Sequence, residues 1–286
     1  MITYVADVMR KKLQTIDFYD GLRKAERLMA ENNVAYLPVM KQGALAGMLT
    51  LKDIHRTHPN RIAADAMKKE VVSVAPTTPL WKAKQILEQH KVEQLPVMEE
   101  GVLVGIIAEP ELLWELGKHI DLLTGLYRSD YIYYQGMELL NSGKEITVIF
   151  LDLNKFGVID KEYGHTQGDI ILKELGSLLR ENTPADAYLC RFGGDEFALL
   201  VPYRLDKSKV LTENIINLID SHVFSNKLTI SAAAGIAGGR RLELRTHAPM
   251  NTISDLINLA SLASTKAKKE KQRLIVAKDF CNYDIA

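Results

Sequence analysis

The heptapeptide RFGGDEF, Arg191 to Phe197, decides how the second half of this chain is interpreted. Apolar residues flank it on both sides, which predicts two short strands joined by a tight turn at Gly193-Gly194. Glycine suits a two-residue hairpin loop because it adopts positive φ freely, and it lets backbone amides approach a phosphate. Asp195 and Glu196 then lie at the tip of the hairpin. An acidic hairpin is by itself more often only a solvated turn, so the rest of the chain must decide its meaning.

A third carboxylate indicates a metal site. Asp152 lies near the end of the predicted strand Glu145–Leu153, EITVIFLDL. If this strand and the strand that begins at Glu196 are neighbours in one sheet, Asp152 and Asp195 converge. Paired carboxylates with a backbone carbonyl form a hard-oxygen site that suits Mg²⁺ bridging phosphates.

The second half alternates strands with helices and includes one tight hairpin. This pattern predicts an α/β (α+β) domain whose mainly antiparallel sheet is flanked by helices. The expected helices are Ser129–Ser142, Lys155–Tyr163, Gln167–Asn182, Lys207–Ser221 and Ile253–Lys269. The expected strands are Glu145–Leu153, Tyr188–Phe192, Glu196–Val201, Lys227–Ile236 and Arg273–Val276.

Four motifs of this half occur in the order and spacing of a known family. They are DLLTGLY from Asp121, FLDLNKFGVIDKEYGHTQGD from Phe150, RFGGDEF, and LTISAAAGIA from Leu228. Residues 119–286 therefore resemble the GGDEF domain of the diguanylate cyclases, which implies a palm-like fold shared with nucleotide cyclases and polymerases. The resemblance also implies a homodimer in which two GTP-loaded domains face each other and, with Mg²⁺ or Mn²⁺, make cyclic di-GMP and pyrophosphate.

The same resemblance assigns the catalytic and metal-binding roles by position. Asp152, the carbonyl of Leu153 and Asp195 are expected to bind metal. Glu196 is expected to assist metal binding or hydroxyl activation. Asp195, Glu196 and Asp152 are therefore the candidate catalytic residues.

The residues expected to contact GTP are Gly193, Gly194, Asp160, Asp169 and Lys268. In the family pattern Asp169 reads guanine N–H donors and Lys268 holds the terminal phosphates. Asp160 departs from that pattern, which has Asn there, and Lys161 stands where the pattern has Asp. An aspartate can accept hydrogen bonds from guanine but cannot donate to its acceptors.

Two cationic contacts of the family pattern are missing as well. Gly157 stands in place of a lysine, and Gln272 in place of an arginine. A charge-assisted hydrogen bond contributes roughly 1.5–3 kcal/mol, so losing both lowers phosphate affinity by about 2–4 orders of magnitude unless another cation compensates. The candidates for that compensation are Lys155, Lys161 and Arg191.

Two interpretations of the second half therefore remain. In the first, it is a weak diguanylate cyclase that needs activation by the first half of the chain. In the second, it is catalytically degenerate and acts as a nucleotide-responsive binding or scaffold module. A changed base preference is a third alternative.

The first half contains an internal repeat. LPVM occurs twice, 58 residues apart, and at the same offset GMLTLKD aligns with GIIAEPE and DVM with DAM. Each copy predicts a helix, two strands joined at Gln42-Gly43 or Glu100-Gly101, and a closing helix. We expect the two copies, residues 1–60 and 61–118, to pack as a pseudo-twofold pair.

This half resembles a tandem pair of CBS domains, through the repeat, through LPV and through the pattern G-h-h-T-x-x-D at Gly47–Asp53. Such modules bind adenine nucleotides, which implies AMP, ADP or ATP as an effector, with Asp53 on the ribose hydroxyls and Thr50 near phosphate. A carboxylate suits a ribose diol because it accepts two hydrogen bonds at once. Ala108 and Glu111 replace these residues in the second copy, so we expect one functional nucleotide site and one weakened or empty site.

Asp53 has a second interpretation. It stands where a helix is expected to begin, and Asp is a favoured N-cap residue. One carboxylate can fill both roles. The module could also act only as a dimerisation unit.

The two halves are joined without a Pro-, Ser- or Gly-rich linker. Glu111–Ile120, ELLWELGKHI, has apolar residues at helical spacing. We hypothesise that ligand binding near Thr50 and Asp53 shifts the CBS pair, and that a stiff helix through Trp114 brings two GGDEF half-sites together or apart.

Composition narrows the partners and the compartment. The 286 residues carry 36 basic and 36 acidic side chains, so no bulk charge favours a nucleic acid partner. Two cysteines provide no disulfide framework, which favours a reducing environment. No segment has the length and apolar character of a signal peptide or a membrane helix. We therefore expect a cytoplasmic protein without a membrane or nucleic acid partner.

Overall fold

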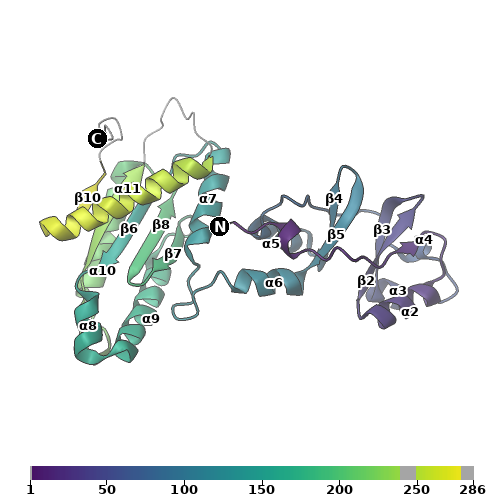
Figure 1. Cartoon of the computed structure of the whole chain (residues 1–286), viewed down its shortest axis with the longest axis horizontal. Helices are drawn as coiled ribbons and strands as arrows, with labels where there is room; N and C mark the ends of the chain where they lie inside the picture. The colour runs from purple at the N-terminus through teal and green to yellow at the C-terminus, as the bar shows by residue number, and fades with distance from the viewer. Residues whose placement is uncertain (1, 239–248, 278–286) are drawn as a thin grey trace. The chain divides into compact units, whose positions relative to one another are not determined.

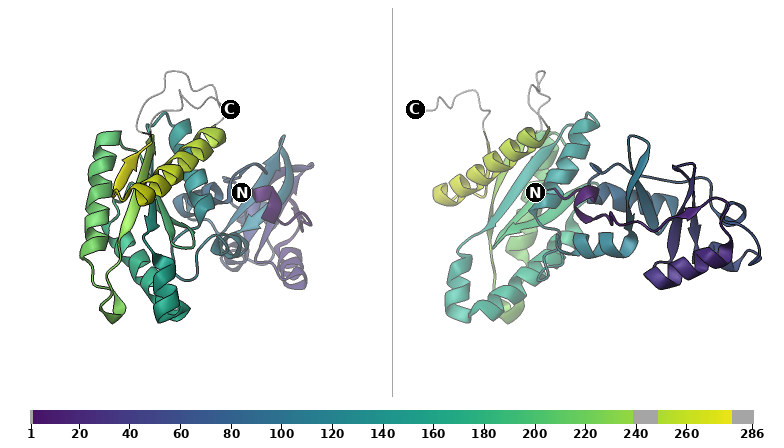
Figure 2. Two further views of the ribbon diagram at one scale, coloured as in Figure 1. Left: turned by 60° about the vertical axis from the view of Figure 1, so that its left-hand side comes forward. Right: turned by 45° about the vertical axis from the view of Figure 1, so that its right-hand side comes forward.

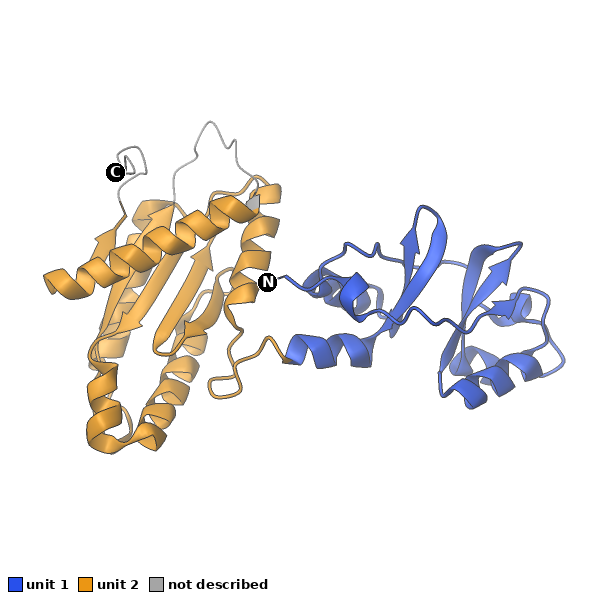
Figure 3. Cartoon of the chain, viewed as in Figure 1, with its two compact units in different colours: residues 1–117 blue, residues 118–286 orange. Residues whose placement is uncertain are grey.

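The computed structural model describes residues 2–238 and 249–277. The chain divides into two compact units, residues 1–117 and 118–286 (Figure 3), and each is described by itself. Cys281 lies outside the described residues. Within them, no helix is both long enough and apolar enough to cross a lipid bilayer.

The first unit consists of the two predicted repeats (Figure 1). The first repeat comprises α1 (Val5–Val8), β1 (Ile16–Asp17), α2 (Leu22–Asn32), β2 (Tyr36–Lys41), β3 (Ala44–Thr50) and α3 (Leu51–His55). The second comprises α4 (Ala63–Ala66), α5 (Leu80–His90), β4 (Gln94–Glu99), β5 (Val102–Ala108) and α6 (Glu109–Gly117). The helices α1 and α2 and the strands β2 and β3 recur 58 residues later, with matching bounds, as α4, α5, β4 and β5. The repeat seen in the sequence is therefore a repeat of structure.

The two hairpins of this unit are built alike. Both are antiparallel, and both turn at a residue pair with positive φ: 50° and 82° at Gln42 and Gly43, 49° and 80° at Glu100 and Gly101. Positive φ at both central residues is typical of the type I′ turns that match the twist of flanking strands. The predicted turn positions are confirmed.

The N-terminal segment of each repeat packs against the other repeat. The Met9 sulfur lies 2.5 Å from where a Cβ on Gly105 would be, and the Met67 sulfur lies 2.6 Å from the same position on Gly47. Each glycine thus leaves room for the methionine of the opposite copy. The boundary near residue 60 therefore divides the sequence into its two repeats. In the structure, the segment that begins each repeat packs against the hairpin of the other repeat.

The second unit contains a five-stranded sheet in the order β10-β9-β6-β8-β7. Its strands are β6 (Thr147–Leu153), β7 (Tyr188–Gly193), β8 (Glu196–Val201), β9 (Ala232–Gly238) and β10 (Leu274–Val276). Its helices are α7 (Ser129–Asn141), α8 (Phe156–Tyr163), α9 (His165–Asn182), α10 (Leu205–Ser221), the 3₁₀ turn η1 (Ser225–Lys227) and α11 (Pro249–Glu270). All strand pairs are antiparallel except β9 with β10. The predicted mixed α/β fold with a mainly antiparallel sheet is confirmed.

The central strand β6 is buried on both faces, and its alternation decides where its last residues point. Val148 and Phe150 belong to the core under α7 and α11, whereas Ile149 and Leu151 belong to the core under α9 and α10. Figure 2 shows these two helical layers on opposite faces of the sheet. Because side chains alternate along a strand, Asp152 lies on the α11 face.

Two predicted elements differ from the structure. The helix predicted over Glu111–Ile120 ends at Gly117, so no continuous helix links the two units along the chain, and α7 begins only at Ser129. The strand predicted from Lys227 begins at Ala232. Lys227 itself has a φ of 58°, and Leu228 turns back so that its carbonyl accepts a hydrogen bond from Phe224 N.

The closest packing between sheet and helix generates the first prediction. A Cβ on Gly235 of β9 would overlap the carbonyl oxygen of Ala260 and the backbone nitrogen of Ser264 in α11. We expect Gly235→Ala to lower the free energy of unfolding by about 2–3 kcal/mol, because backbone atoms of two packed elements must separate. Urea denaturation of the full chain measures it.

Gly157→Ala is the matched control, since a Cβ at Gly157 meets nothing within 4 Å. It should leave stability unchanged or raise it by up to about 1 kcal/mol, because alanine favours a helix. Equal stability of the two variants would contradict this account of the α11–β9 contact.

Candidate functional site

The strand register brings three carboxylates to one end of the sheet. Asp152 of β6 lies directly opposite Glu196 of β8. The backbone of Asp195 lies beside the end of β6, since Leu153 N donates a hydrogen bond to the Asp195 carbonyl over 3.4 Å. The two strands, β6 and β8, are therefore neighbours in one sheet, as the sequence predicts.

The turn of the hairpin lies one residue later than predicted. Gly193 pairs with Glu196, so the two-residue loop is Gly194-Asp195, and the register shifts between Arg191 and Gly193. Only Gly194 has a positive φ, 47°. Gly193 instead lies beside Glu196, with 4.0 Å between its Cβ position and a Glu196 oxygen.

Lys268 of α11 forms an ion pair with Asp152. The contact follows from the alternation of β6, which directs Asp152 toward α11. Burial raises the pKa of the Asp152 carboxyl; the Lys268 ammonium acts in the opposite direction, and the nearby charge of Asp195 adds to the rise. One cation thus offsets part of the cost of placing this acid at the end of a buried strand.

Glu196 lies in a similar environment. Burial is the main cause that raises the pKa of the Glu196 carboxyl, and the charges of Asp152 and Asp195 add to the rise. The Lys268 ammonium opposes these effects only in part. Crowded, partly desolvated carboxylates favour an additional cation, and their oxygens suit Mg²⁺ or Mn²⁺. Within residues 2–238 and 249–277, no three His, Cys, Asp or Glu side chains are already arranged as a metal site. A divalent ion held by these carboxylates would need a carbonyl, water or ligand to complete its coordination.

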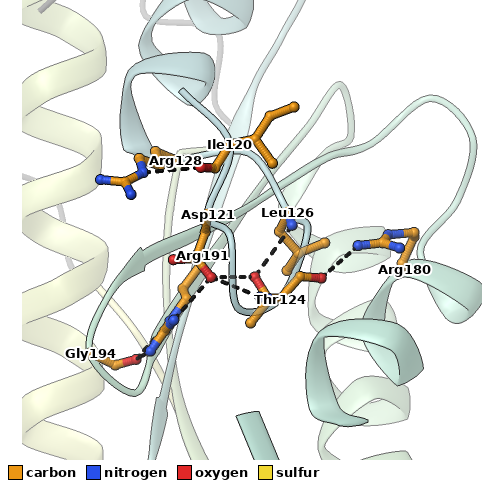
Figure 4. A network of polar contacts seen from close by, with 8 residues as sticks. All are labelled: Ile120, Asp121, Thr124, Leu126, Arg128, Arg180, Arg191 and Gly194. Atoms are coloured by element: carbon orange, nitrogen blue, oxygen red, sulfur yellow. Dashed lines mark hydrogen bonds and ion pairs between the residues drawn. The ribbon is translucent and has the colours of Figure 1, made fainter. Parts of the chain in front are cut away.

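A network that the sequence analysis did not anticipate holds the hairpin tip in place (Figure 4). Arg191 donates to the Gly194 carbonyl through Nε (2.9 Å) and Nη2 (2.7 Å), and to Asp121 Oδ1 through Nη1 (2.9 Å). Asp121 Oδ1 also accepts from the backbone N and the hydroxyl of Thr124. Arg191 thus uses three of its five N–H donors to hold the hairpin tip and the loop at Asp121. The D-x-x-T spacing at Asp121 was the available sequence signal.

Asp121 is tuned by the same contacts. Burial works to raise the pKa of its carboxyl, but the hydrogen bonds from Thr124 and Arg191 outweigh burial and hold the pKa below its usual value. Arg180 extends the network by donating to the Thr124 carbonyl over 2.8 Å. The loop before α7 is thereby fixed to both β7 and α9.

A cavity of about 290 Å³ lies between the hairpin tip and the helices α8 and α9. Its lining brings together four residues predicted to contact nucleotide or metal: Asp160, Asp169, Gly194 and Asp195. The Asp160 carboxylate lies 3.3 Å from His165 Nδ1 and close enough to Gly168 that a Cβ there would overlap it. Gly168 is therefore required for the carboxylate to lie against the first turns of α9.

The first unit has two clefts related by the repeat. The larger, about 360 Å³, is lined by Thr50, Lys68 and Val92 among others, and the smaller, about 210 Å³, by Arg10 and Val34, which are the repeat equivalents of Lys68 and Val92. Of the two residues predicted to bind the nucleotide, Thr50 and Asp53, Thr50 lines the larger cleft and neither lines the smaller one.

Asp53 does not line the cleft. Its Oδ2 accepts hydrogen bonds from the backbone N (3.0 Å) and the hydroxyl (2.6 Å) of Thr50, which completes a capping box at the start of α3. Asp53 therefore does cap the helix, but the predicted position was wrong: Thr50 is the N-cap residue and Asp53 is the third residue of α3. Any contact with ribose would need the remaining oxygen of Asp53.

The smaller cleft differs by an ion pair. Glu111, the repeat equivalent of Asp53, forms an ion pair with Arg10. Beside this pair, burial raises the pKa of Tyr36, while the charge of Arg10 lowers it and the charge of Glu111 raises it. The guanidinium that could hold a phosphate is thus already occupied by a carboxylate of the protein.

Comparison with family models agrees with this architecture. The model for the diguanylate cyclase GGDEF domain matches residues 118–273, and the model for the CBS domain matches residues 5–58 and 63–118. The chain belongs to the GGDEF-domain family of diguanylate cyclases and carries a tandem pair of CBS domains.

Individual relatives match one half each. The CBS domain-containing protein YhcV of Bacillus subtilis is 35% identical over 114 residues, 38% of this chain and 81% of the relative. The diguanylate cyclase DgcS of Shewanella oneidensis is 31% identical over 122 residues, 41% of each chain, so this chain spans less than half of that cyclase. A solved structure of the diguanylate cyclase SiaD of Pseudomonas aeruginosa, in complex with its activator SiaC, shares the fold at a TM-score of 0.50 and 22% identity, covering 59% of this chain and 65% of SiaD.

The Arg191 network generates the second prediction. Lysine cannot reproduce the three hydrogen bonds of Arg191 in their present geometry, because its ammonium group lacks the planar guanidinium fork. We expect Arg191→Lys to lower the free energy of unfolding by about 1.5–3 kcal/mol, the contribution of a hydrogen bond to a charged group. Urea denaturation of the full chain measures the change.

Arg204→Lys serves as its control, because the Arg204 side chain is 85% exposed and its ion pair with Glu145 spans 3.3 Å. An exposed pair contributes little, so the shift should stay within about 0.5 kcal/mol. If both substitutions had equally small effects, Arg191 would not be the anchor of the hairpin.

Proposed function

We propose that the protein is a diguanylate cyclase that makes cyclic di-GMP from two GTP molecules and is regulated by an adenine nucleotide bound to its CBS pair. The observation that carries the proposal is the arrangement of Asp152 opposite Glu196, with Asp195 in the adjoining turn and Lys268 on Asp152. It combines metal-compatible carboxylates with a cation suited to phosphate, next to a cavity of about 290 Å³.

Each residue has a defined role in this proposal. Asp152, Asp195 and the Leu153 carbonyl would hold Mg²⁺ or Mn²⁺, which supplies charge neutralisation at the phosphates when bound. Glu196, whose pKa is raised by burial, would accept the proton of a ribose 3′-hydroxyl. The hydroxyl oxygen attacks the α-phosphorus of the opposite GTP, and pyrophosphate leaves; two such steps close the ring.

Base recognition is assigned to the cavity beside α9. Asp160 and Asp169 both line it, and guanine offers N–H donors at N1 and N2 to carboxylate acceptors. Two acids in one pocket raise the cost of admitting a triphosphate, from which we expect weak activity in the absence of an effector. Because each half-site holds one GTP, the proposal requires a homodimer.

The alternative function is that of a binding or scaffold module without catalysis. Gly157 and Gln272 stand where the family pattern has a lysine and an arginine, and the loss of these two cations favours a domain that binds nucleotide or a partner without catalysis. The alternative differs in that it makes no product under any condition.

Turnover of GTP with Mg²⁺ or Mn²⁺, with and without AMP and ATP, tests the proposal, with products resolved by chromatography. We expect cyclic di-GMP from the native chain and at least a thousandfold less from Asp195→Ala, because a metal-binding carboxylate is lost. Glu181→Ala, an exposed acid on α9, is the control and should retain full activity. Cyclic di-GMP formation absent from the native chain under every effector would favour the scaffold alternative.

Nucleotide binding by the first unit is tested separately by calorimetry with AMP and ATP. We expect one site per chain, in the cleft lined by Thr50 and Lys68. Lys68→Ala should weaken binding about tenfold or more, through loss of a charge-assisted hydrogen bond. Lys12→Ala removes the same charge from the smaller cleft and should have no effect. Two equal sites, or a stronger effect of Lys12→Ala, would contradict the assignment.

A further inference from the structure

A cavity of about 730 Å³ in the second unit lies beyond the carboxylates, between the turn after β6 and the end of α11. Its charged lining residues are Lys155, Asp220, Lys268, Lys271 and Arg273. Four cations therefore surround a space with one acid, which makes the cavity attractive to a polyanion.

The contacts of these residues show which cations are available. Asp220 pairs with Arg273 at 2.6 Å, and Arg273 also donates to Asn217 at 2.8 Å. Lys268 is held by Asp152. Across residues 2–238 and 249–277, neither Lys155 nor Lys271 has an ion-pair partner, so their ammonium groups are free to meet a ligand.

Both lysines have fixed backbones. Lys155 has a φ of 54° at the N-cap of α8, and Lys271 a φ of 55° directly after α11. The left-handed region costs a non-glycine residue roughly 1–2 kcal/mol and persists only where the surroundings impose it. Lys271 N donates to Lys268 O (3.3 Å) and Gln272 N to Ala267 O (2.9 Å), which ties this turn to the helix end.

We propose that Lys155 and Lys271, together with Lys268, bind the β- and γ-phosphates of the nucleotide, a role that rests on the proposed function of the neighbouring carboxylates. They replace the two cations missing at Gly157 and Gln272. Arg191 lines the cavity beside α9 and not this one, and three of its N–H donors are used by Asp121 and Gly194. Lys161 does not line this cavity.

Lys268 connects the two parts of the site. It contacts Asp152 and also lines the cavity. When the terminal phosphates enter, Lys268 can exchange the carboxylate for phosphate oxygens, which leaves Asp152 open to a divalent cation. Binding of polyphosphate and of metal are therefore expected to reinforce each other.

Inorganic tripolyphosphate is the probe, titrated calorimetrically into the full chain with and without Mg²⁺. The variants are Lys155→Asn and Lys271→Asn, because asparagine tolerates the left-handed backbone. Each should weaken tripolyphosphate about tenfold, the double variant about a hundredfold, and raise the KM for GTP with little change in kcat. Lys227→Asn is the control: Lys227 also has a positive φ, 58°, and lies outside the cavity.

Failure of this inference is distinguishable from failure of the proposed function. Native turnover with unchanged tripolyphosphate affinity and unchanged KM in the double variant overturns the role of Lys155 and Lys271 and leaves the cyclase assignment intact. Lysine-dependent tripolyphosphate binding without any GTP turnover supports the cavity and overturns the cyclase. A loss in Lys227→Asn equal to that in the double variant would mean nonspecific attraction and would also overturn the inference.

Discussion

Asp152 is an acid at the end of a strand that is otherwise buried on both faces, and the ion pair with Lys268 makes that position tolerable. Without the ammonium of Lys268, desolvation and the charges of Asp195 and Glu196 would all oppose an ionised carboxylate there. The same pair links the central strand to α11, and through Lys268 it connects the carboxylates with the cation-lined cavity. The geometry of the proposed reaction therefore depends on one contact, which in turn depends on the alternation of β6.

The two clefts of the CBS pair show how a repeat can diverge without changing its fold. The hairpins, their turns and the glycine–methionine contacts are preserved in both copies. The polar residues are not: Thr50 and Lys68 line one cleft, whereas Arg10 is neutralised by Glu111 at the other. Packing fixes the shape of both clefts, and a few side chains decide which one is open to an anionic ligand.

Much of the architecture was predictable because its signals are local. The apolar pattern located β8 at Glu196–Val201, with the bounds that the structure has, and the repeat offset located both hairpins. The features that the sequence did not predict depend on contacts distant in sequence or on backbone geometry. The end of α6 at Gly117, the reversal at Lys227 and the one-residue shift of the hairpin turn have no periodic signature. For the site, sequence indicated which acids to consider, but only the structure showed that Arg191 is engaged by Asp121 and that Lys271 lines a cavity with Lys268.

The most direct test of the account is the affinity of a non-hydrolysable GTP analogue with and without Mg²⁺, in the native chain and in Asp152→Asn. If Asp152 holds the metal and exchanges Lys268 for phosphate, the cation should strengthen binding at least tenfold in the native chain. In Asp152→Asn, which frees Lys268, that dependence on the metal should disappear while binding without metal is kept or improved. Equal affinity with and without Mg²⁺ in the native chain would contradict the assignment of this end of the sheet as a metal-dependent nucleotide site.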